Sequence, residues 1–346
     1  MSNSSASGGE VKVAVVGAGG IARSVHLPSL SEMSDVKLVA ICDLIPERAQ
    51  EQAAKWGIPK TYTLMRDMFA HEDIDAVFCL VEPGSMFHVA SLAIEHGYYT
   101  MMEKPPGITA YQADSLARKA DRSGKHVMVA FNRRFIPVVR KTKEMVKAAT
   151  KKVTQVEGCF FKYGDPAFDK GALCSFMSDT IHSVDLIRYL SDGKEAKKAA
   201  MVINSYDSPV DDAWNGICVF DNDVTGIIKA NYRVGGRVHQ FQMHGIGVSS
   251  FIDLGMGAQI DVKSRILTHT GAISYSLAAT GAAKEDSVVL DGRELAGSND
   301  FHKFYGYYAE DRHFIDCIKS GETPETCIQD ARLSVHLVEK FLANQI

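Results

Sequence analysis

The sequence predicts an α/β protein of two domains, in which an N-terminal Rossmann-type doubly wound parallel sheet precedes a C-terminal α+β domain. The 346 residues exceed the usual size of a single hydrophobic core. The first third alternates short β-rich apolar runs with amphipathic stretches, which is typical of parallel strands joined by crossover helices. From Val153 onward, longer β-like runs follow one another with few helices between them, which favours a large, mostly antiparallel open sheet.

The first domain is expected over residues 10–131, after a disordered lead-in at residues 1–9. Its strand candidates are Val11–Val16, Val36–Cys42, Ala76–Leu80, Tyr98–Met102 and His126–Ala130. Helical periodicity lies between them at Ile21–Met33, Pro46–Trp56, Ser85–His96 and Ala110–Arg122. These elements together predict one parallel sheet with helices on its faces.

The second domain is expected over residues 132–346 and would serve substrate binding and oligomerisation. Its strand candidates are Val153–Tyr163, Ala199–Ser205, Asn215–Asp221, Val224–Tyr232, Val238–His244 and Ser249–Asp253. Helices are predicted at Phe176–Leu190, Tyr307–Ile318 and Cys327–Leu342, the last of which could pack back on the first domain.

Composition narrows the class of partner. A formal net charge of -4 argues against nucleic acid, because phosphate binding draws on dense basic patches. No apolar run reaches the length of a membrane span, and the polar N-terminus lacks the apolar core of a secretory signal, so no membrane partner is expected. The seven cysteines include no C-x-x-C pair, which indicates a reducing compartment, the cytoplasm. A small-molecule partner is therefore expected.

The turn after the first strand, Gly17-Ala18-Gly19-Gly20-Ile21-Ala22, fits the dinucleotide-binding pattern G-x-G-x-x-A. Gly17 permits the tight exit from the strand, and Gly19 lets the backbone approach a pyrophosphate. The amides of Gly20 and Ile21, at the start of the helix, would hold the phosphates together with the helix dipole. The position of this turn inside a βαβ unit makes the signal specific.

Asp43 ends the next predicted strand, at about the separation expected for a carboxylate that binds the adenosine ribose hydroxyls. NAD is therefore favoured over NADP. Arg48, five residues on, could instead receive a 2′-phosphate, or could simply be an exposed residue in the first turn of a helix.

Two further motifs carry chemistry. Glu103-Lys104-Pro105 follows the strand predicted at Tyr98–Met102, where an open α/β sheet places its ligand-facing residues; in isolation it would read as a surface ion and a stiffened loop. Asp179, His182 and Asp185 fall at three-residue spacing, on one face of the helix predicted there. A carboxylate beside an imidazole can orient a general base, although a surface salt cluster would give the same pattern.

In this order and with these separations, the motifs resemble the family of glucose-fructose oxidoreductase, inositol dehydrogenase and rhizopine catabolism protein, called Gfo/Idh/MocA. The resemblance covers nearly the whole chain. GAGGIARSVHLPSL is similar to the family's cofactor turn and first helix, EHGYYTMMEKPPG to its lysine motif and DTIHSVDLIRYL to its histidine helix. AFNRRFIP resembles the segment that connects the first domain of the family to the second.

The resemblance implies an NAD-dependent oxidoreductase that transfers a hydride between nicotinamide and a carbinol of a sugar, sugar derivative or cyclic polyol. It implies that His182 is the principal base, and that Lys104 polarises the substrate oxygen and shares the proton. Asp179 would assist His182, and Glu103 and Lys104 would also border the cofactor. The resemblance also implies that the protein assembles as a homodimer or homotetramer.

The chain departs from the family pattern in two places. The family's aspartate stands four residues before the histidine, where this chain has Ser178, and Asp179 stands at three. After the strand at Ala76–Leu80, where the family usually has T-P-N, the chain has Val81-Glu82-Pro83-Gly84. These departures keep open a redox-neutral enzyme that oxidises a glycoside transiently on bound NAD.

A third hypothesis is a catalytically silent NAD-binding regulatory protein. The presence of Lys104 and His182 argues against it, because a binding protein needs neither residue. No metal is expected, because the histidines lack ligand-like clustering. Several residues of the second domain could face a substrate, although each also suits surface or core packing: Asn132, Arg133, Lys162, Tyr163, Asp165, Trp214, Arg237 and His239.

Overall fold

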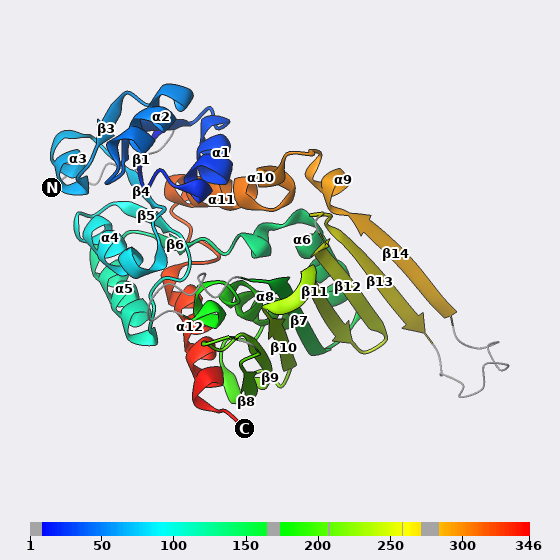
Figure 1. Cartoon of the computed structure of the whole chain (residues 1–346). Coiled ribbons are helices and arrows are strands. Elements are labelled where there is room, and N and C mark those ends of the chain that lie inside the picture. The colour runs from blue at the N-terminus through cyan, green and yellow to red at the C-terminus, as the bar shows by residue number, and fades with distance from the viewer. Residues whose placement is uncertain (1–8, 165–173, 207, 258, 271–283) are drawn as a thin grey trace. The chain divides into compact units, whose positions relative to one another are not determined.

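The structure is a computed structural model that describes residues 9–164, 174–206, 208–257, 259–270 and 284–346 (Figure 1). Apart from Gly9, the predicted lead-in lies outside the described residues, as does Asp165. The chain divides into two compact units, one of residues up to Asn132 together with Asp300–His336, the other of Arg133–Asn299 together with Leu337–Ile346. Our sequence-based division keeps all of 132–346 in the second domain, whereas this grouping assigns Asp300–His336 to the first unit.

The first unit is built on a six-stranded, entirely parallel sheet of order β3-β2-β1-β4-β5-β6. Its strands are β1 (Val11–Val16), β2 (Val36–Cys42), β3 (Lys60–Tyr62), β4 (Ala76–Cys79), β5 (Tyr99–Met102) and β6 (Val127–Val129). In β1 every residue except Lys12 is buried, as expected of a strand covered on both faces. The strand order reverses between β1 and β4, and such switch points bind ligands at the carboxyl ends of the strands. The predicted doubly wound sheet is confirmed.

Helices connect these strands and complete the unit. They are α2 (Pro46–Trp56), α3 (Met65–His71), α4 (Pro83–Glu95), α5 (Ala110–Ser123), α10 (Phe301–Phe304), α11 (Tyr307–Ser320) and the first part of α12 (Ile328–Ala343). The helix after the glycine turn contains a π-helical turn, η1 (Ala22–His26), and continues as α1 (Leu27–Ser31). π-turns are rare and frequently occur at functional sites. The prediction of one helix over Ile21–Met33 located this segment but not its π-turn.

The second unit is built on an eight-stranded sheet of order β14-β13-β12-β11-β7-β10-β9-β8, in which only β7 and β10 pair in parallel (Figure 1). Its strands are β7 (Val153–Tyr163), β8 (Ala196–Asn204), β9 (Ala213–Phe220), β10 (Thr225–Asn231), β11 (Arg233–Gly245), β12 (Val248–Met256), β13 (Lys263–Thr270) and β14 (Lys284–Asp291). The mostly antiparallel open sheet is thus confirmed. The strands β13 and β14 were not predicted.

The remaining helical segments are η2 (Asn132–Phe135), α6 (Pro137–Ala149), α7 (Ser175–Ser178), α8 (Ile181–Ser191) and α9 (Gly292–Ala296). Helix α8 packs on β7, and a Cβ added at Gly158 of β7 would lie 2.5 Å from the Ser183 Oγ of α8. Helix and strand therefore approach as closely as glycine allows.

The continuous helix predicted over Phe176–Leu190 is wrong. The chain breaks between α7 and α8 at Asp179, whose φ of -130° and ψ of -49° are not helical. Apolar spacing continues through the break, with Met177, Ile181 and Val184 all buried, so periodicity alone could not reveal it.

Within the described ranges, no helix combines the length and hydropathy needed to cross a membrane. No two of the seven cysteines form a disulfide within the described part of the chain.

Candidate functional site

The glycine turn between β1 and η1 has the shape that a dinucleotide requires. Gly17 has a φ of +100°, and a Cβ there would lie 2.3 Å from the carbonyl oxygen of Leu80, so only glycine fits. At Gly19 and Gly20, by contrast, an added Cβ would meet no described atom within 4 Å. Packing within the protein therefore does not explain these two glycines. Close approach of a bound pyrophosphate to the backbone does explain them.

The carboxylate of Asp43 is hydrogen-bonded directly to this turn. Its Oδ2 accepts the amide hydrogen of Ala18 at 2.7 Å, and its Oδ1 accepts that of Ile45 at 2.9 Å. The carboxylate is half-buried at the carboxyl end of β2, beside the glycine turn. Arg48 is exposed in the first turn of α2. Asp43, together with the glycine turn, fits the adenosine and pyrophosphate parts of NAD.

Glu103 belongs to a buried network that sequence reasoning missed. The imidazole of His26 lies between two carboxylates, with Nδ1 2.9 Å from Asp311 Oδ1 and Nε2 3.2 Å from Glu103 Oε1. His26 and Asp311 have no solvent exposure, and Glu103 is 8% exposed. Burial lowers the pKa of His26, but Asp311 and Glu103 together raise it well above its ordinary value. The imidazole is therefore held as a cation between the two acids.

Lys104 is positioned by this network. It follows β5 and is half-buried, and its backbone amide donates to Glu103 Oε2 at 3.1 Å. The network thus connects the π-turn of the first helix, through His26 and Glu103, to the backbone of the predicted catalytic lysine. His26 lies within the segment GAGGIARSVHLP, but only the fold shows that it meets Asp311, which is 285 residues away in sequence.

Asp179 is held by neighbouring side chains of the second unit. Its Oδ2 accepts a hydrogen bond from the Tyr232 hydroxyl at 2.8 Å and forms an ion pair with the Lys162 ammonium. Burial, followed by the charge of Asp179, raises the pKa of Tyr232, so the phenol stays protonated and donates. The hydroxyls of Thr180 and Tyr232 lie 2.9 Å apart and extend this network.

His182 is half-buried in the first turn of α8, and its backbone amide donates to the carbonyl oxygen of Asp179 at 3.2 Å. Asp185 is buried and accepts two hydrogen bonds from the guanidinium of Arg134. The expected stripe of Asp179, His182 and Asp185 on one helix face is therefore wrong, because Asp179 precedes α8 and Asp185 belongs to a structural ion pair. Lys104 lies in the first unit, and Asp179 and His182 lie in the second.

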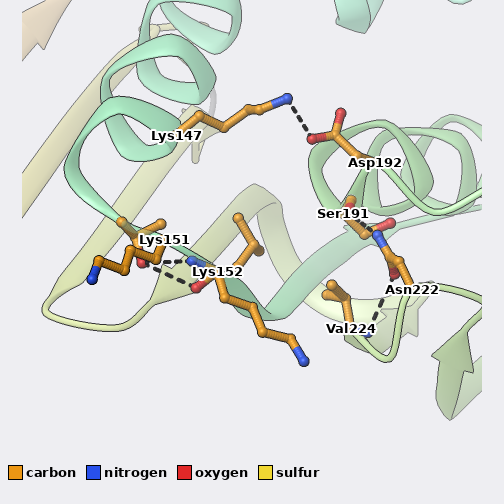
Figure 2. A pocket seen from close by; sticks show the side chains of 9 residues that line it. Lys147, Lys151, Lys152, Ser191, Asp192, Asn222 and Val224 are labelled. Carbon is orange, nitrogen blue, oxygen red and sulfur yellow. Dashed lines mark hydrogen bonds and ion pairs between the residues drawn. The ribbon is translucent and has the colours of Figure 1, made fainter.

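Two other features of the structure, a surface pocket and a group of potential metal ligands, are explained without a functional site. A surface pocket near the end of α6 is lined by Lys147, Thr150, Lys151, Lys152, Val153, Ser191, Asp192, Asn222 and Val224 (Figure 2). None of the predicted site residues lines it, and Asp192 already pairs with Lys147 at 2.7 Å.

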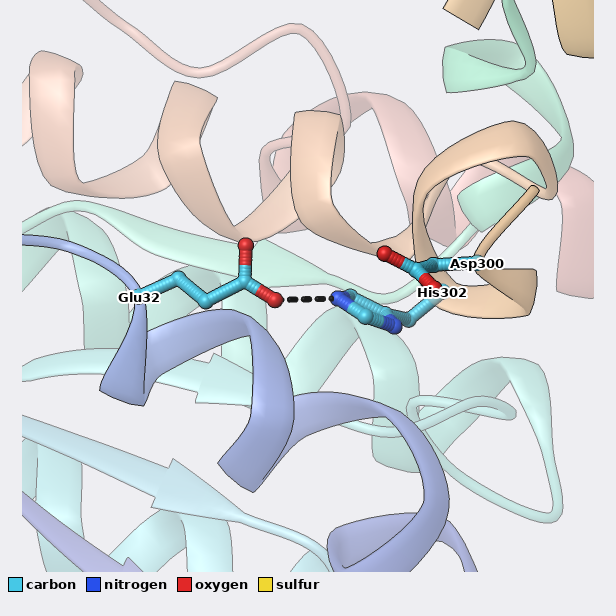
Figure 3. Close-up of side chains that lie close together, drawn as sticks. All are labelled: Glu32, Asp300 and His302. Atoms are coloured by element: carbon cyan, nitrogen blue, oxygen red, sulfur yellow. Dashed lines mark hydrogen bonds and ion pairs between the residues drawn. The ribbon is translucent and has the colours of Figure 1, made fainter. Parts of the chain in front are cut away.

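Glu32, Asp300 and His302 bring three potential metal-ligating atoms within 4.8 Å of one another (Figure 3). The Lys303 ammonium, however, lies 2.7 Å from Glu32 Oε2 and 3.4 Å from Asp300 Oδ2. Ion pairing accounts for this cluster, because one cation already faces both carboxylates.

The parallel sheet with its glycine turn, followed by a second, mostly antiparallel unit, has the architecture of a dinucleotide-binding domain joined to a second domain. Residues 11–131 match the family model of Gfo/Idh/MocA, described as an oxidoreductase family with an NAD-binding Rossmann fold. The resemblance that the motifs predicted is thus confirmed for residues 11–131.

Similar proteins include sugar and polyol dehydrogenases. The scyllo-inositol 2-dehydrogenase (NAD(+)) of Bacillus subtilis is 25% identical over 338 residues, which cover 95% of this chain and 92% of the relative. The D-glucoside 3-dehydrogenase of Escherichia coli is 30% identical over 136 residues, only 39% of each protein. The crystal structure of a dehydrogenase from Chromobacterium violaceum shares the fold, with a TM-score of 0.83 at 21% identity over 97% of this chain and 96% of that chain.

Proposed function

We propose that this protein is an NAD-dependent dehydrogenase that oxidises a carbinol of a sugar, a sugar derivative or a cyclic polyol. The observation that carries the proposal is the fixed placement of Lys104. This lysine follows β5, an interior strand of the parallel sheet, and its backbone amide is hydrogen-bonded to Glu103, which contacts the buried His26 and, through it, Asp311. The dehydrogenase names of the Bacillus and Escherichia relatives support the same reaction class.

In this proposal the first unit holds NAD. The backbone at Gly17, Gly19, Gly20 and Ile21 takes the pyrophosphate, and Asp43 takes the adenosine ribose hydroxyls. Glu103 and Lys104 border the nicotinamide. When bound, NAD supplies the hydride acceptor. The negative charge of Asp43 favours NAD over NADP, because it would face the 2′-phosphate of NADP.

The side chains of both units share the proton chemistry in this proposal. His182 accepts the hydroxyl proton of the substrate as the principal base, and the Lys104 ammonium polarises the oxygen that loses it. Asp179 is a positioning residue, since its carboxylate is engaged by Lys162 and Tyr232 and its carbonyl oxygen accepts the His182 amide hydrogen. The proposal includes that Lys104 and His182 act at the same carbon of the substrate.

The test is mass spectrometry of sugars, glycosides and inositols after incubation with the purified protein and NAD. A product lighter by two hydrogens, formed together with NADH, is expected. Replacing Lys104 by Met or His182 by Gln should each lower kcat/KM for that substrate by about 10²- to 10⁴-fold. A product of unchanged oxidation state would contradict the proposal, and so would full activity of the Lys104→Met variant.

We further propose that the protein assembles as a homodimer or homotetramer through the outer face of the eight-stranded sheet. One row of cross-strand neighbours on this face contains Ile217 of β9, Phe251 of β12 and Val289 of β14, which are 48%, 42% and 61% exposed. The same row also contains Ile227 and the polar residues Glu157, Gln242 and Arg265. A second copy of the chain would cover these apolar side chains, as the interfaces of symmetric oligomers do.

A further inference from the structure

The imidazole of His26 contacts one carboxylate through each of its two nitrogens. Nδ1 lies 2.9 Å and 3.1 Å from the two carboxylate oxygens of Asp311, and Nε2 lies 3.2 Å from Glu103 Oε1. Phe78 of β4 and Tyr307 of α11 make T-shaped contacts with the imidazole, each with ring centroids 6.0 Å apart. This packing restricts rotation of the imidazole, so both nitrogens keep facing the two acids.

Glu103 connects His26 to the main chain at Lys104. Its Oε1 faces His26, whereas its Oε2 accepts the amide hydrogen of Lys104 at 3.1 Å. The amide of Glu103 itself donates to the carbonyl oxygen of Cys79, at the end of β4, at 3.0 Å. The peptide bond between Glu103 and Lys104 is therefore held by the neighbouring strand and by the Glu103 carboxylate. Its second attachment depends on the orientation of that carboxylate.

The charges that act on His26 are those of Asp311 and Glu103. Elements that pack against η1 or contact the ring carry these other titratable side chains: Tyr307 of α11, whose ring touches the imidazole, and His302 and Lys303 of α10, which pair with Glu32. The charge of His26 is thus matched by the two acids that contact it.

The charge state of His26 decides whether both of its contacts are hydrogen bonds. An imidazolium has two N–H donors, whereas a neutral imidazole has one N–H and one lone pair. After loss of the proton, one of the two carboxylates faces a lone pair and is repelled. Asp311 has no solvent exposure and Glu103 is 8% exposed, so bulk water does not readily replace the lost donor.

We propose that His26 and Asp311 are positioning residues of the dehydrogenase, and that Lys104 is held for catalysis only while His26 is charged. In the charged state, Glu103 is fixed and its Oε2 holds the Lys104 amide. In the neutral state, Glu103 is released from His26, and the Lys104 backbone loses its fixed acceptor. Neither His26 nor Asp311 contacts substrate or NAD in this proposal, which rests on the proposed dehydrogenase function.

The proposal assigns an alkaline decline of kcat to His26. Burial lowers the pKa of His26, but Asp311 and Glu103 together raise it well above its ordinary value. The ring is therefore charged below this folded pKa and loses its proton as the pH rises through it. The value of kcat should fall over the same interval. KM for NAD should stay nearly constant, because the glycine turn makes none of these contacts.

Hydrogen exchange at the Lys104 amide tests the positioning without a substrate. Pro105 and Pro106 follow Lys104 and have no amide hydrogen, so mass spectrometry of short peptides from this segment isolates the amides of Glu103 and Lys104. The Glu103 amide, which is bound to β4, is the internal reference.

Asp311→Asn removes one of the two charges that keep His26 protonated. At about pH 8 the Lys104 amide should exchange about tenfold faster in this variant than in the wild-type protein, the factor of one hydrogen bond. Asp316→Asn is the matched control, because Asp316 lies on the same helix, is 62% exposed and pairs with Arg312. It should leave the exchange unchanged. Equal exchange in Asp311→Asn and the wild-type protein would overturn the proposal.

The wild-type protein gives a second test that does not depend on the folding of a variant. The ratio of the exchange rates of the Lys104 and Glu103 amides cancels most of the intrinsic effect of pH on exchange. This ratio should rise as the pH increases through the folded pKa of His26. A constant ratio would overturn the proposal.

Kinetics test the catalytic consequence, with the sugar, glycoside or inositol that the mass-spectrometric panel shows to be oxidised. The decline of kcat in Asp311→Asn should begin about one to three pH units below that of the wild-type protein, the effect of removing one adjacent opposite charge. KM for NAD should not change. A loss of kcat by the same factor at every pH is the mark of a merely structural role and would overturn the proposal.

Failure of this proposal can be told apart from failure of the proposed function. Activity that Lys104→Met abolishes but Asp311→Asn leaves unchanged at every pH would keep the dehydrogenase and remove the positioning role. Faster exchange at Lys104 in Asp311→Asn, in a protein that oxidises no member of the panel, would support the control of Lys104 by His26 and remove the dehydrogenase.

Discussion

His26 is a buried cation whose stabilising effect depends on pH. Its folded pKa lies well above the ordinary value of 6.5, since Asp311 and Glu103 outweigh burial. The stability gained from the charged ring is therefore complete below about pH 6.5, and is lost as the pH rises through the folded pKa.

His26→Ala should destabilise the protein by about 3 to 5 kcal/mol at pH 6, because it leaves Asp311 and Glu103 buried without their cation. The difference from the wild-type protein should narrow as the pH rises through the folded pKa of His26, because the wild-type ring then loses its charge. Thermal unfolding from pH 6 to 10 measures both effects. His71→Ala, at an exposed histidine of α3, is the control and should stay close to wild type throughout. A pH-independent loss in His26→Ala would contradict the cationic assignment.

Asp43 should determine the choice of cofactor. Asp43→Asn removes the negative charge that would repel the 2′-phosphate of NADP. The side-chain oxygen of the asparagine can still accept a hydrogen bond from one of the two backbone amides, those of Ala18 and Ile45. The ratio of kcat/KM for NAD to that for NADP should fall by about tenfold to a hundredfold, which corresponds to about 1.4 to 2.7 kcal/mol. Glu47→Gln, an exposed acid in the first turn of α2, is the matched control. An unchanged ratio in Asp43→Asn would exclude this role.

At the scale of elements, the close contact between β7 and α8 fixes the helix that carries His182. A Cβ at Gly158 would lie 2.5 Å from Ser183 Oγ and 3.1 Å from Ile187. Gly158→Ala should therefore destabilise the protein by about 1 to 3 kcal/mol, which lowers Tm by about 2 to 4 °C for each kcal/mol. It should also lower kcat, by displacing α8. At Gly235 an added Cβ meets no described atom within 4 Å, so Gly235→Ala should leave Tm nearly unchanged. Equal effects of the two substitutions would contradict this packing.

The elements that the sequence predicts well are those with a local signal. The strands β1 and β2 begin and end where predicted, because their buried apolar runs are bounded by polar or glycine residues. Strand β13 reads KSRILTHT, and its polar residues obscure the alternation. The same distinction holds for the site. The glycine turn and Glu103-Lys104 are local motifs, whereas the partners of Asp179 and His239 come from other elements of the second unit, such as Tyr232 after β10 and Arg133 in η2.

At the scale of the whole molecule, the exposed apolar side chains Ile217, Phe251 and Val289 on the eight-stranded sheet predict self-association. Phe251→Glu replaces one of these apolar side chains by a charge, so the variant should shift toward the monomer in size-exclusion chromatography with light scattering. Leu64→Glu, at an apolar residue of the first unit that is 54% exposed, tests whether any added charge has this effect. A wild-type protein that is monomeric at micromolar concentration would contradict the proposed assembly.

The pairing of His26 with Asp311 also constrains how the protein is made. The two residues are separated by 285 positions, and Asp311 belongs to a segment that completes the first unit only after the whole of residues 133–299 has been synthesised. At roughly 5 to 20 residues per second, the ribosome needs on the order of 15 to 60 s to cover that separation. For the part of this interval after Glu103 has been added, the nascent nucleotide-binding sheet carries His26 and Glu103 without their third partner. The first unit therefore cannot complete its fold while its N-terminal part is leaving the ribosome. It completes its fold only near the end of translation.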